Sequence, residues 1–319
     1  MRRFLKTLLF FFILLLAVIY PLDRLFSISL AKTEIGEFSV WNDILEAEVE
    51  DPLLIYGSSR AWVQIDPQII EDSLGISAYN FGIDGHNFQL QYLRHSLNLK
   101  YNGSPEYIIQ IVDHATLQKR PDLYNLNQFL PYMLFNEHFY KYTSDYLGFE
   151  KYDFFIPLIR YSGNTNAMAN ILFSWYGKVD SKKIRYKGFR ANDKTWNKDF
   201  DRAKNKFKSY KIDLDSQSID LFEDFIIECQ NNSTKLILVY PPEYIEGQLF
   251  IENRASLINL YENIASKHSL LFLDYSKDEI NYNKDFFYNV LHLNKNGSKV
   301  FSATLANDLK SILKPQIVI

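Results

Sequence analysis

Residues 53–60 read Leu-Leu-Ile-Tyr-Gly-Ser-Ser-Arg, a short apolar run that stops at a glycine and is followed by two hydroxyls and a guanidinium. An apolar run of this length, bounded by Pro52 and Gly57, predicts a strand of a parallel sheet, because such strands are covered on both faces and need not alternate. Open α/β sheets place their chemistry beyond the carboxyl ends of their strands. We therefore expect Ser59 at that edge of the sheet, after a glycine that permits a sharp turn.

Strands and helices alternate on both sides of this stretch. The apolar runs predict five strands, at residues 53–57, 78–82, 107–112, 236–240 and 270–273. The helical patterns between and after them lie at residues 66–75, 87–99, from about 216, at 254–267 and at the carboxyl end. Repeated strand–helix units of this kind imply a parallel sheet, and we expect a flavodoxin-like three-layer sandwich.

An aromatic-rich segment, residues 114–215, interrupts the alternation. It carries 22 Phe, Tyr or Trp, enough to bury a core of its own. Within it, residues 178–211 hold 13 Lys or Arg against 4 Asp, so their net charge is near +9. This basic stretch is either a solvated loop or a surface for anionic glycan, lipid phosphate or an acidic partner face. We expect domains at residues 1–30, at 31–113 with 216–319, and at 114–215.

The amino terminus predicts a membrane anchor. Arg2, Arg3 and Lys6 precede an unbroken apolar run from Leu8 to Ile19. A signal peptide and a short signal anchor both fit this length, and we favour an uncleaved anchor with its basic end in the cytoplasm and the remainder outside. A periplasmic or extracellular location makes a nucleic-acid partner improbable.

The overall composition excludes few classes of partner or site. The net charge of −3 points to no particular partner, and the single cysteine, Cys229, excludes an intramolecular disulfide. The six histidines show no metal-ligand spacing, and we expect neither a metal nor a cofactor.

Three separated stretches carry a family resemblance: residues 57–60, residues 80–85 (Asn-Phe-Gly-Ile-Asp-Gly) and residues 289–294 (Asn-Val-Leu-His-Leu-Asn). In this order they resemble the SGNH (GDSL-type) hydrolase and acyltransferase superfamily, and its membrane-anchored branch that acts on cell-envelope polymers. The resemblance implies that Ser59 is the nucleophile and His292 the general base. It also implies that Gly85 and the Ser59 N–H group belong to the oxyanion hole.

The chain departs from the family pattern at two positions. The family has an aspartate three residues before the histidine, where this sequence has Asn289; Asp285 is an alternative orienting group. The family's third oxyanion donor is an asparagine after strand three, where this sequence has Asp113. An asparagine can fix an imidazole tautomer but carries no charge to stabilise an imidazolium, so we expect a slow or degenerate enzyme.

Three further residues are candidates for substrate contact: Arg60, His86 and His114. The leading hypothesis is an O-acyltransferase or esterase that acts on a cell-envelope polysaccharide, with acetyl as the expected acyl group and a multi-spanning membrane acyltransferase as the partner that the resemblance implies. Two alternatives stay open. One is a catalytically inactive accessory or scaffold protein of an envelope acylation system, and the other is a carbohydrate-binding protein that uses the insertion.

Overall fold

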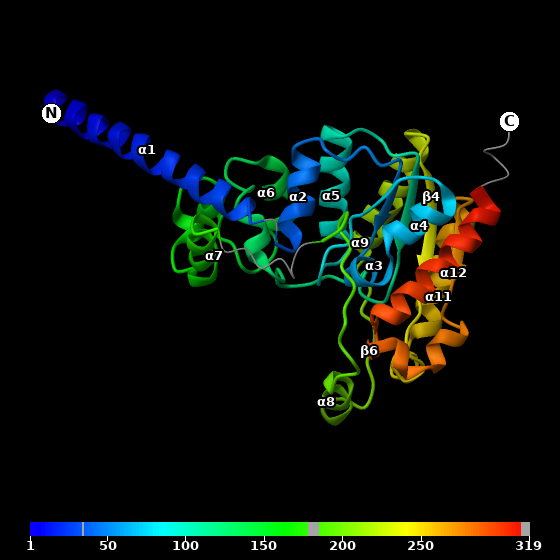
Figure 1. Ribbon diagram of the computed structural model, residues 1–319. Coiled ribbons are helices and arrows are strands. Elements are labelled where there is room, and N and C mark those ends of the chain that lie inside the picture. Colours follow the sequence, from blue (N-terminus) through cyan, green and yellow to red (C-terminus); the bar gives the residue numbers. More distant parts are fainter. Residues whose placement is uncertain (34, 178–184, 314–319) are drawn as a thin grey trace. The chain divides into compact units, whose positions relative to one another are not determined.

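The computed structural model describes the whole chain except residues 34, 178–184 and 314–319 (Figure 1). The chain forms two compact units. Unit 1 comprises residues 1–42 and 121–184, and unit 2 comprises residues 43–120 and 185–319. These boundaries differ from the domains expected from the sequence, because unit 1 combines the N-terminal helix with only part of the aromatic segment.

Unit 2 is built on one five-stranded parallel sheet with the order β2-β1-β3-β4-β5. The strands are β1 (Leu53–Tyr56), β2 (Ala78–Asn80), β3 (Tyr107–Ile111), β4 (Lys235–Tyr240) and β5 (Leu271–Asp274). This is the flavodoxin-like order, so the predicted fold class is confirmed. The strand order reverses between β1 and β3, where such sheets form their ligand crevice.

Helices cover both faces of this sheet. Alternate residues of the strands, such as Leu53, Ile109 and Val239, pack with Leu305 in one buried cluster. The helices on that face are α3 (Ser59–Gln64), α4 (Pro67–Leu74) and α12 (Lys295–Leu313). The other face is covered by α5 (Phe88–Tyr101), α9 (Ser216–Asn231) and α11 (Arg254–Lys267).

Local sequence signals fix the ends of α4. The Asp66 side chain accepts a hydrogen bond from the Gln68 N–H group as the N-cap, and Pro67 follows at the first helical position. Gly75 ends the helix with φ +72°, a left-handed conformation that glycine adopts without strain. The predicted helix at 66–75 is therefore confirmed with both its caps.

The described part of the basic stretch belongs to unit 2. The Lys187 carbonyl accepts from the Asn80 N–H group beside β2, and the Asn192 carbonyl accepts from Lys295 at the start of α12. Helix α8 (Asp199–Lys206) and the residues after it continue along the same unit, where the Tyr210 N–H group donates to the Phe250 carbonyl. Part of this stretch, residues 178–184, lies outside the described residues.

Unit 1 is small and rich in aromatic side chains. Trp41 of α2 (Glu37–Leu45) is fully buried, packs against Phe129 and Phe139, and donates from Nε1 to the Gln128 side chain at 3.1 Å. The other helices of this unit are α6 (Glu137–Thr143), α7 (Thr165–Trp175) and the 3-10 turns η1 (Leu126–Phe129), η2 (Lys151–Phe154) and η3 (Ile159–Tyr161).

Helix α1 (Arg2–Ala31) has two parts with different surroundings. Its large apolar side chains from Phe4 to Leu22 are mostly exposed, and it is long and apolar enough to be a membrane anchor or a signal sequence. Its last turns pack against α7 (Figure 1). There the buried Asp23 carboxylate binds the buried Arg160 guanidinium through two hydrogen bonds of 2.7 and 2.8 Å.

Candidate active site

Ser59 lies at the end of β1, where the chain turns sharply into α3. Gly57 makes the turn with φ +149°, and a Cβ atom there would lie 2.8 Å from the Cβ atoms of Ala61 and Ile111. The Ser58 hydroxyl caps α3 by accepting from the Arg60 N–H group at 3.3 Å. Ser59 is the first helical residue, so its own N–H group has no acceptor inside the helix.

His292 faces Ser59 from the other end of the chain. The Ser59 Oγ atom lies 2.7 Å from His292 Nε2. His292 begins β7 (His292–Leu293), which pairs with β6 (Phe287–Asn289) in a short antiparallel hairpin. The structure thus brings together two side chains that are 233 positions apart.

Asn289 holds the imidazole from behind. Its Oδ1 atom accepts from the backbone N–H groups of Leu291 at 3.0 Å and His292 at 2.9 Å, which identifies it as the oxygen of the amide. The same atom lies 3.0 Å from His292 Nδ1, so Nδ1 must carry a proton and donate it. Nε2 then has a free electron pair toward the Ser59 hydroxyl. This is the tautomer that a general base requires.

Packing fixes the ring and keeps it neutral. The Tyr288 ring stacks on the imidazole with centroids 5.3 Å apart and planes at 9°, and Gln64 Nε2 donates to the Leu291 carbonyl at 2.8 Å. Burial lowers the pKa of His292 to about 3, with Arg60 and His114 adding to the effect and Asp113 opposing it. The base is neutral at physiological pH, but it accepts a proton weakly.

Asp113 is an acceptor in this structure and supplies no oxyanion donor. One carboxylate oxygen accepts from the Ser58 hydroxyl at 2.6 Å, and the other accepts from the N–H groups of Ala115 and Thr116. Burial acts to raise the pKa of Asp113, but His114, Arg60 and the hydrogen bonds outweigh it, so the pKa is lowered. The ionised carboxylate has no proton to donate, so the third donor that the resemblance implies is missing at this position.

Gly85 lies in the loop that follows β2 and passes along the end of β1. The Ile83 N–H group donates to the Gly57 carbonyl at 3.0 Å, and Gly85 has φ +74°. The fully buried Asn80 supports this loop, because its Nδ2 donates to the Ala61 and Ile65 carbonyls while its Oδ1 accepts from Gly82. The loop runs beside the residues that carry the nucleophile, with Gly85 as the predicted donor.

Arg60 has a structural role in place of the substrate contact that we expected. It is 1% exposed, and its guanidinium bonds to Glu243 Oε1 at 2.9 Å and to the Pro241 and Pro242 carbonyls. Arg254 contacts the other oxygen of Glu243 at 3.3 Å. This network connects α3 to the loop after β4, and no pattern in the sequence marks Glu243 as its centre.

The other two expected substrate contacts differ from each other. His86 is buried at 1% exposure, so it is not accessible to a substrate in this conformation. His114 is partly exposed, with Nδ1 3.9 Å from Glu243 Oε1, and it lines a cavity beside the site. Asp285, the alternative orienting group, is exposed and caps the end of the hairpin through its backbone.

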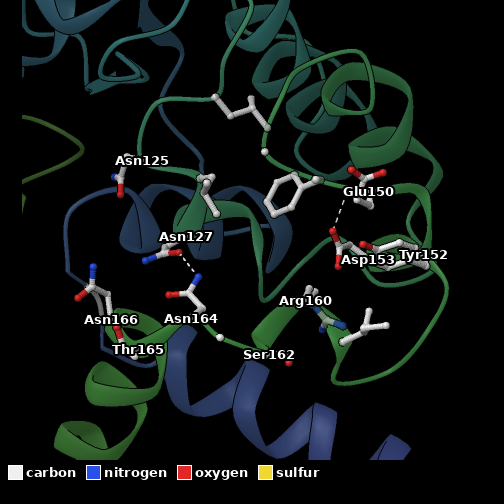
Figure 2. Close-up of a pocket in the computed structure, with 16 residues that line it drawn as sticks. Asn125, Asn127, Glu150, Tyr152, Asp153, Arg160, Ser162, Asn164, Thr165 and Asn166 are labelled. Atoms are coloured by element: carbon white, nitrogen blue, oxygen red, sulfur yellow. Dashed lines mark hydrogen bonds between the residues drawn. The ribbon is translucent and has the colours of Figure 1, made fainter.

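Unit 2 and unit 1 each contain a cavity. An apolar cavity of about 330 Å³ lies in unit 2 between α8, α10 (Ile245–Leu249) and residues Asn289–Leu291. A polar cavity of about 910 Å³ lies in unit 1, and Figure 2 shows asparagine side chains lining it together with Tyr152 and Glu150. Among the described residues, no group of three His, Cys, Asp or Glu side chains could hold a metal ion.

Comparison with known proteins gives similar solved structures at low identity. No family model matches the chain, and no curated protein matches it. An acetyl xylan esterase is 12% identical with a TM-score of 0.41, over 82% of this chain and 98% of the other. A GDSL-like lipase from Bacteroides thetaiotaomicron is 11% identical with a TM-score of 0.37, over 86% of this chain and 98% of the other. These similarities concern the fold and carry no argument about substrate.

The sheet order and the positions of Ser59, Gly85 and His292 are observed in this chain and do not depend on the similar solved structures. They agree with the order of elements that the resemblance implies, in which the nucleophile follows the first strand and the histidine precedes the last helix. The sheet order and the order of these elements are thus the ones that the resemblance to the SGNH (GDSL-type) superfamily predicts.

Proposed function

We propose that this protein is a serine-dependent esterase or acyltransferase that forms an acyl-enzyme on Ser59. The observation that carries the proposal is the relay of Ser59 Oγ, His292 and Asn289 Oδ1, with separations of 2.7 and 3.0 Å. A serine hydroxyl needs a base within this distance to become a nucleophile.

The geometry supports a two-step reaction. In the first step the Ser59 oxygen attacks the ester carbonyl while Nε2 takes its proton, and the imidazolium then gives that proton to the leaving alcohol. The Ser59 and Gly85 N–H groups are the proposed donors to the oxyanion. In the second step a water molecule or an acceptor hydroxyl repeats the attack on the acyl-serine.

Two features make this a slow site. Asn289 fixes the tautomer but provides no negative charge to the imidazolium, and the low pKa of His292 weakens it as a base. Asp113 provides an acceptor where the family has a donor. The proposed turnover is therefore modest, and the acyl-enzyme is expected to accumulate when the second step is slower than the first.

The proposed acceptor is a cell-envelope polysaccharide, with a multi-spanning membrane acyltransferase as the partner that provides the acyl group. Both follow from the resemblance to the envelope branch of the superfamily. The proposed location is outside the cytoplasmic membrane, with α1 as an anchor.

Retention of α1 has support in the structure. Signal-peptide cleavage after Ser29-Leu30-Ala31, where small residues would permit it, would remove Asp23 and leave the buried Arg160 without its carboxylate. Loss of one partner of a buried ion pair destabilises a fold by about 3–5 kcal/mol. An uncleaved anchor keeps this pair, whereas a cleaved signal sequence breaks it.

The test is a stopped-flow measurement of p-nitrophenol release from p-nitrophenyl acetate by the full chain. We expect a burst or turnover that Ser59→Ala and His292→Ala both abolish, and that Ser311→Ala, at an exposed serine of α12, leaves intact. Intact mass measurement of the quenched reaction identifies the acyl-serine. Release by the native protein no faster than by the two site variants would support the inactive accessory protein instead.

A second candidate function, glycan binding, has a specific observation in its favour. The cavity of Figure 2 contains amide groups of Asn125, Asn127 and Asn166, the carboxylate of Glu150 and the exposed ring of Tyr152. Amides and carboxylates match the paired hydroxyls of a sugar, and an aromatic face matches its apolar side. Titration of neutral oligosaccharides of β-linked glucose, xylose and N-acetylglucosamine, with Tyr152→Ala and the exposed Tyr282→Ala as the control, tests this function independently of Ser59.

A further inference from the structure

The apolar cavity of unit 2 lies against the loop that carries the proposed base. Its wall includes Asn289, Val290 and Leu291, the three residues before His292. It also includes His114, the residue after the Asp113 that binds the Ser58 hydroxyl. The two-step reaction proposed above uses nothing in this cavity beyond Asn289.

Most of the remaining wall is hydrophobic and comes from neighbouring elements, and Asp199 and Tyr210 are its polar members. Phe200 and Ala203 belong to α8, Phe207 follows that helix, and Phe250 and Ile251 follow α10. The Phe200 and Phe250 rings pack edge to face with centroids 5.5 Å apart. Contact between such a wall and a hydrocarbon chain makes binding of the chain favourable, because both surfaces are removed from water. The same wall offers few hydrogen bonds to a sugar.

We propose that this cavity binds the acyl chain of the substrate, and that the acyl group is a hydrocarbon chain of several carbons rather than acetyl. This inference rests on the proposed function. The cavity volume of about 330 Å³ equals roughly eleven water molecules at ~30 Å³ each, far more than the single methyl of an acetyl group fills. Asn289 lines the cavity and also orients His292, whose other ring nitrogen lies 2.7 Å from Ser59 Oγ, so the cavity and the proposed nucleophile are separated by one imidazole ring.

The charge around the cavity indicates the head group of this substrate. Residues 198–211, which include α8, hold six Lys or Arg and two Asp, and the wall segment 246–252 adds Glu246 and Glu252, so the two segments together carry a net charge of +2. Lys204 is paired with Asp201 and Glu246, and Arg202 with Asp199, whereas for Lys206 and Lys208 we find no carboxylate partner within the described ranges 1–33, 35–177 and 185–313. Lys206 and Lys208 flank Phe207 of the cavity wall in the sequence, and cations next to an apolar wall favour an anionic amphiphile whose chain enters the cavity while its charged carrier stays outside.

The first experiment measures chain-length preference. The full chain in phosphatidylcholine nanodiscs is assayed with p-nitrophenyl acetate, butyrate, octanoate and laurate. We expect kcat/KM for octanoate to exceed that for acetate by about tenfold or more, because each buried methylene adds binding free energy. Ala203→Trp, which places a large ring in the cavity, should lower the octanoate-to-acetate ratio at least tenfold, and Asn205→Trp on the exposed side of the same helix should leave the ratio unchanged.

The second experiment locates the chain without any turnover. Ser59→Ala in the same nanodiscs is irradiated with decanoic acid that carries a diazirine at its far end, and the labelled peptides are identified by mass spectrometry. Labels on residues 199–210 or 247–251 support the inference, and excess unmodified decanoate should remove them. Replacement of Lys206 and Lys208 by Glu should weaken the labelling.

Failure of the proposed function and failure of the acyl-chain assignment give different results. If Ser59→Ala retains the esterase activity, the proposed function fails, while the labelling still reports on the cavity. If Ser59 carries the activity but acetate is the best ester and Ala203→Trp leaves the ratio unchanged, the acyl-chain assignment is overturned. Labels that fall only outside the cavity residues overturn it as well.

Discussion

The Asn289→Asp substitution tests the electrostatic account of His292. The carboxylate would occupy the place of an oxygen that now lies 3.0 Å from Nδ1 and accepts two backbone N–H bonds. Opposite unit charges at about 4 Å interact by about 4 kcal/mol at an effective dielectric constant of 20. At about 1.36 kcal/mol per pKa unit this is close to 3 units, and the partial exposure of the loop reduces it to about 2.

The expected pKa of His292 in this variant is therefore about 5, compared with about 3 in the native protein. The imidazolium that forms during the attack is stabilised by the same interaction, so esterase activity at pH 7 should rise by about tenfold. The acid limb of the kcat/KM profile should move upward by about 2 pH units, because the base works only when neutral. The variant thus gains activity at pH 7, and its activity declines at a higher pH than that of the native protein.

The pH profile of kcat/KM checks the predicted change in activity, and NMR titration of the ring checks the pKa of His292 without any catalysis. Titration of the His292 Cε1–H resonance, assigned with His292→Ala, should show a half-protonated ring near pH 5 in Asn289→Asp and a neutral ring at that pH in the native protein. Asn283→Asp, at an exposed N-cap six residues earlier, is the matched control and should change neither result. An unchanged resonance in Asn289→Asp would refute the reasoning, because the carboxylate would then not face the ring.

Three further substitutions follow from the packing. Gly57→Ala should destabilise unit 2 by at least about 1–3 kcal/mol in urea titration, because Gly57 has a positive φ and the added Cβ would meet Ala61 and Ile111. Gly103→Ala is the control and should destabilise the unit less, because its Cβ meets open space. Asp23→Ala should lower the stability of unit 1 by about 3–5 kcal/mol in thermal unfolding, whereas the exposed Asp145→Ala should have little effect. The pKa of His292 lies below its unfolded value of about 6.5, so the unfolded chain binds more protons and stability falls as pH decreases from 6.5 toward 3. Calorimetry should show a smaller fall for His292→Leu than for the native protein, because other groups with lowered pKa values, such as Asp113 and His95, remain; an equal fall would contradict this account.

The sheet could be predicted because its signals are local. Each buried strand is an apolar run between turn residues, and α4 carries an N-cap aspartate, a first-turn proline and a terminal glycine within ten residues. The hairpin of β6 and β7 escaped prediction because its strands have three and two residues. Such short strands leave no periodic pattern.

The pairing of Ser59 with His292 could be anticipated only through the resemblance, because no local pattern relates two residues 233 positions apart. The role of Arg60 escaped for the same reason, since its partner Glu243 comes from a loop beyond β4. An arginine beside a nucleophile suggests a substrate contact until its burial is known. The sequence did not show whether Asp113 would act as a donor or an acceptor. No pattern in the sequence indicated that the Ser58 hydroxyl would bind its carboxylate.

The continuity of α1 has a mechanical consequence. The helix continues through Pro21 from its exposed apolar part to the Asp23–Arg160 pair, so no loop separates the apolar part from the rest of unit 1. Rotation or tilt of the helix would therefore rotate or tilt the rest of unit 1 by the same movement. As a membrane anchor, this helix would therefore set the orientation of unit 1 as well as hold it at the membrane.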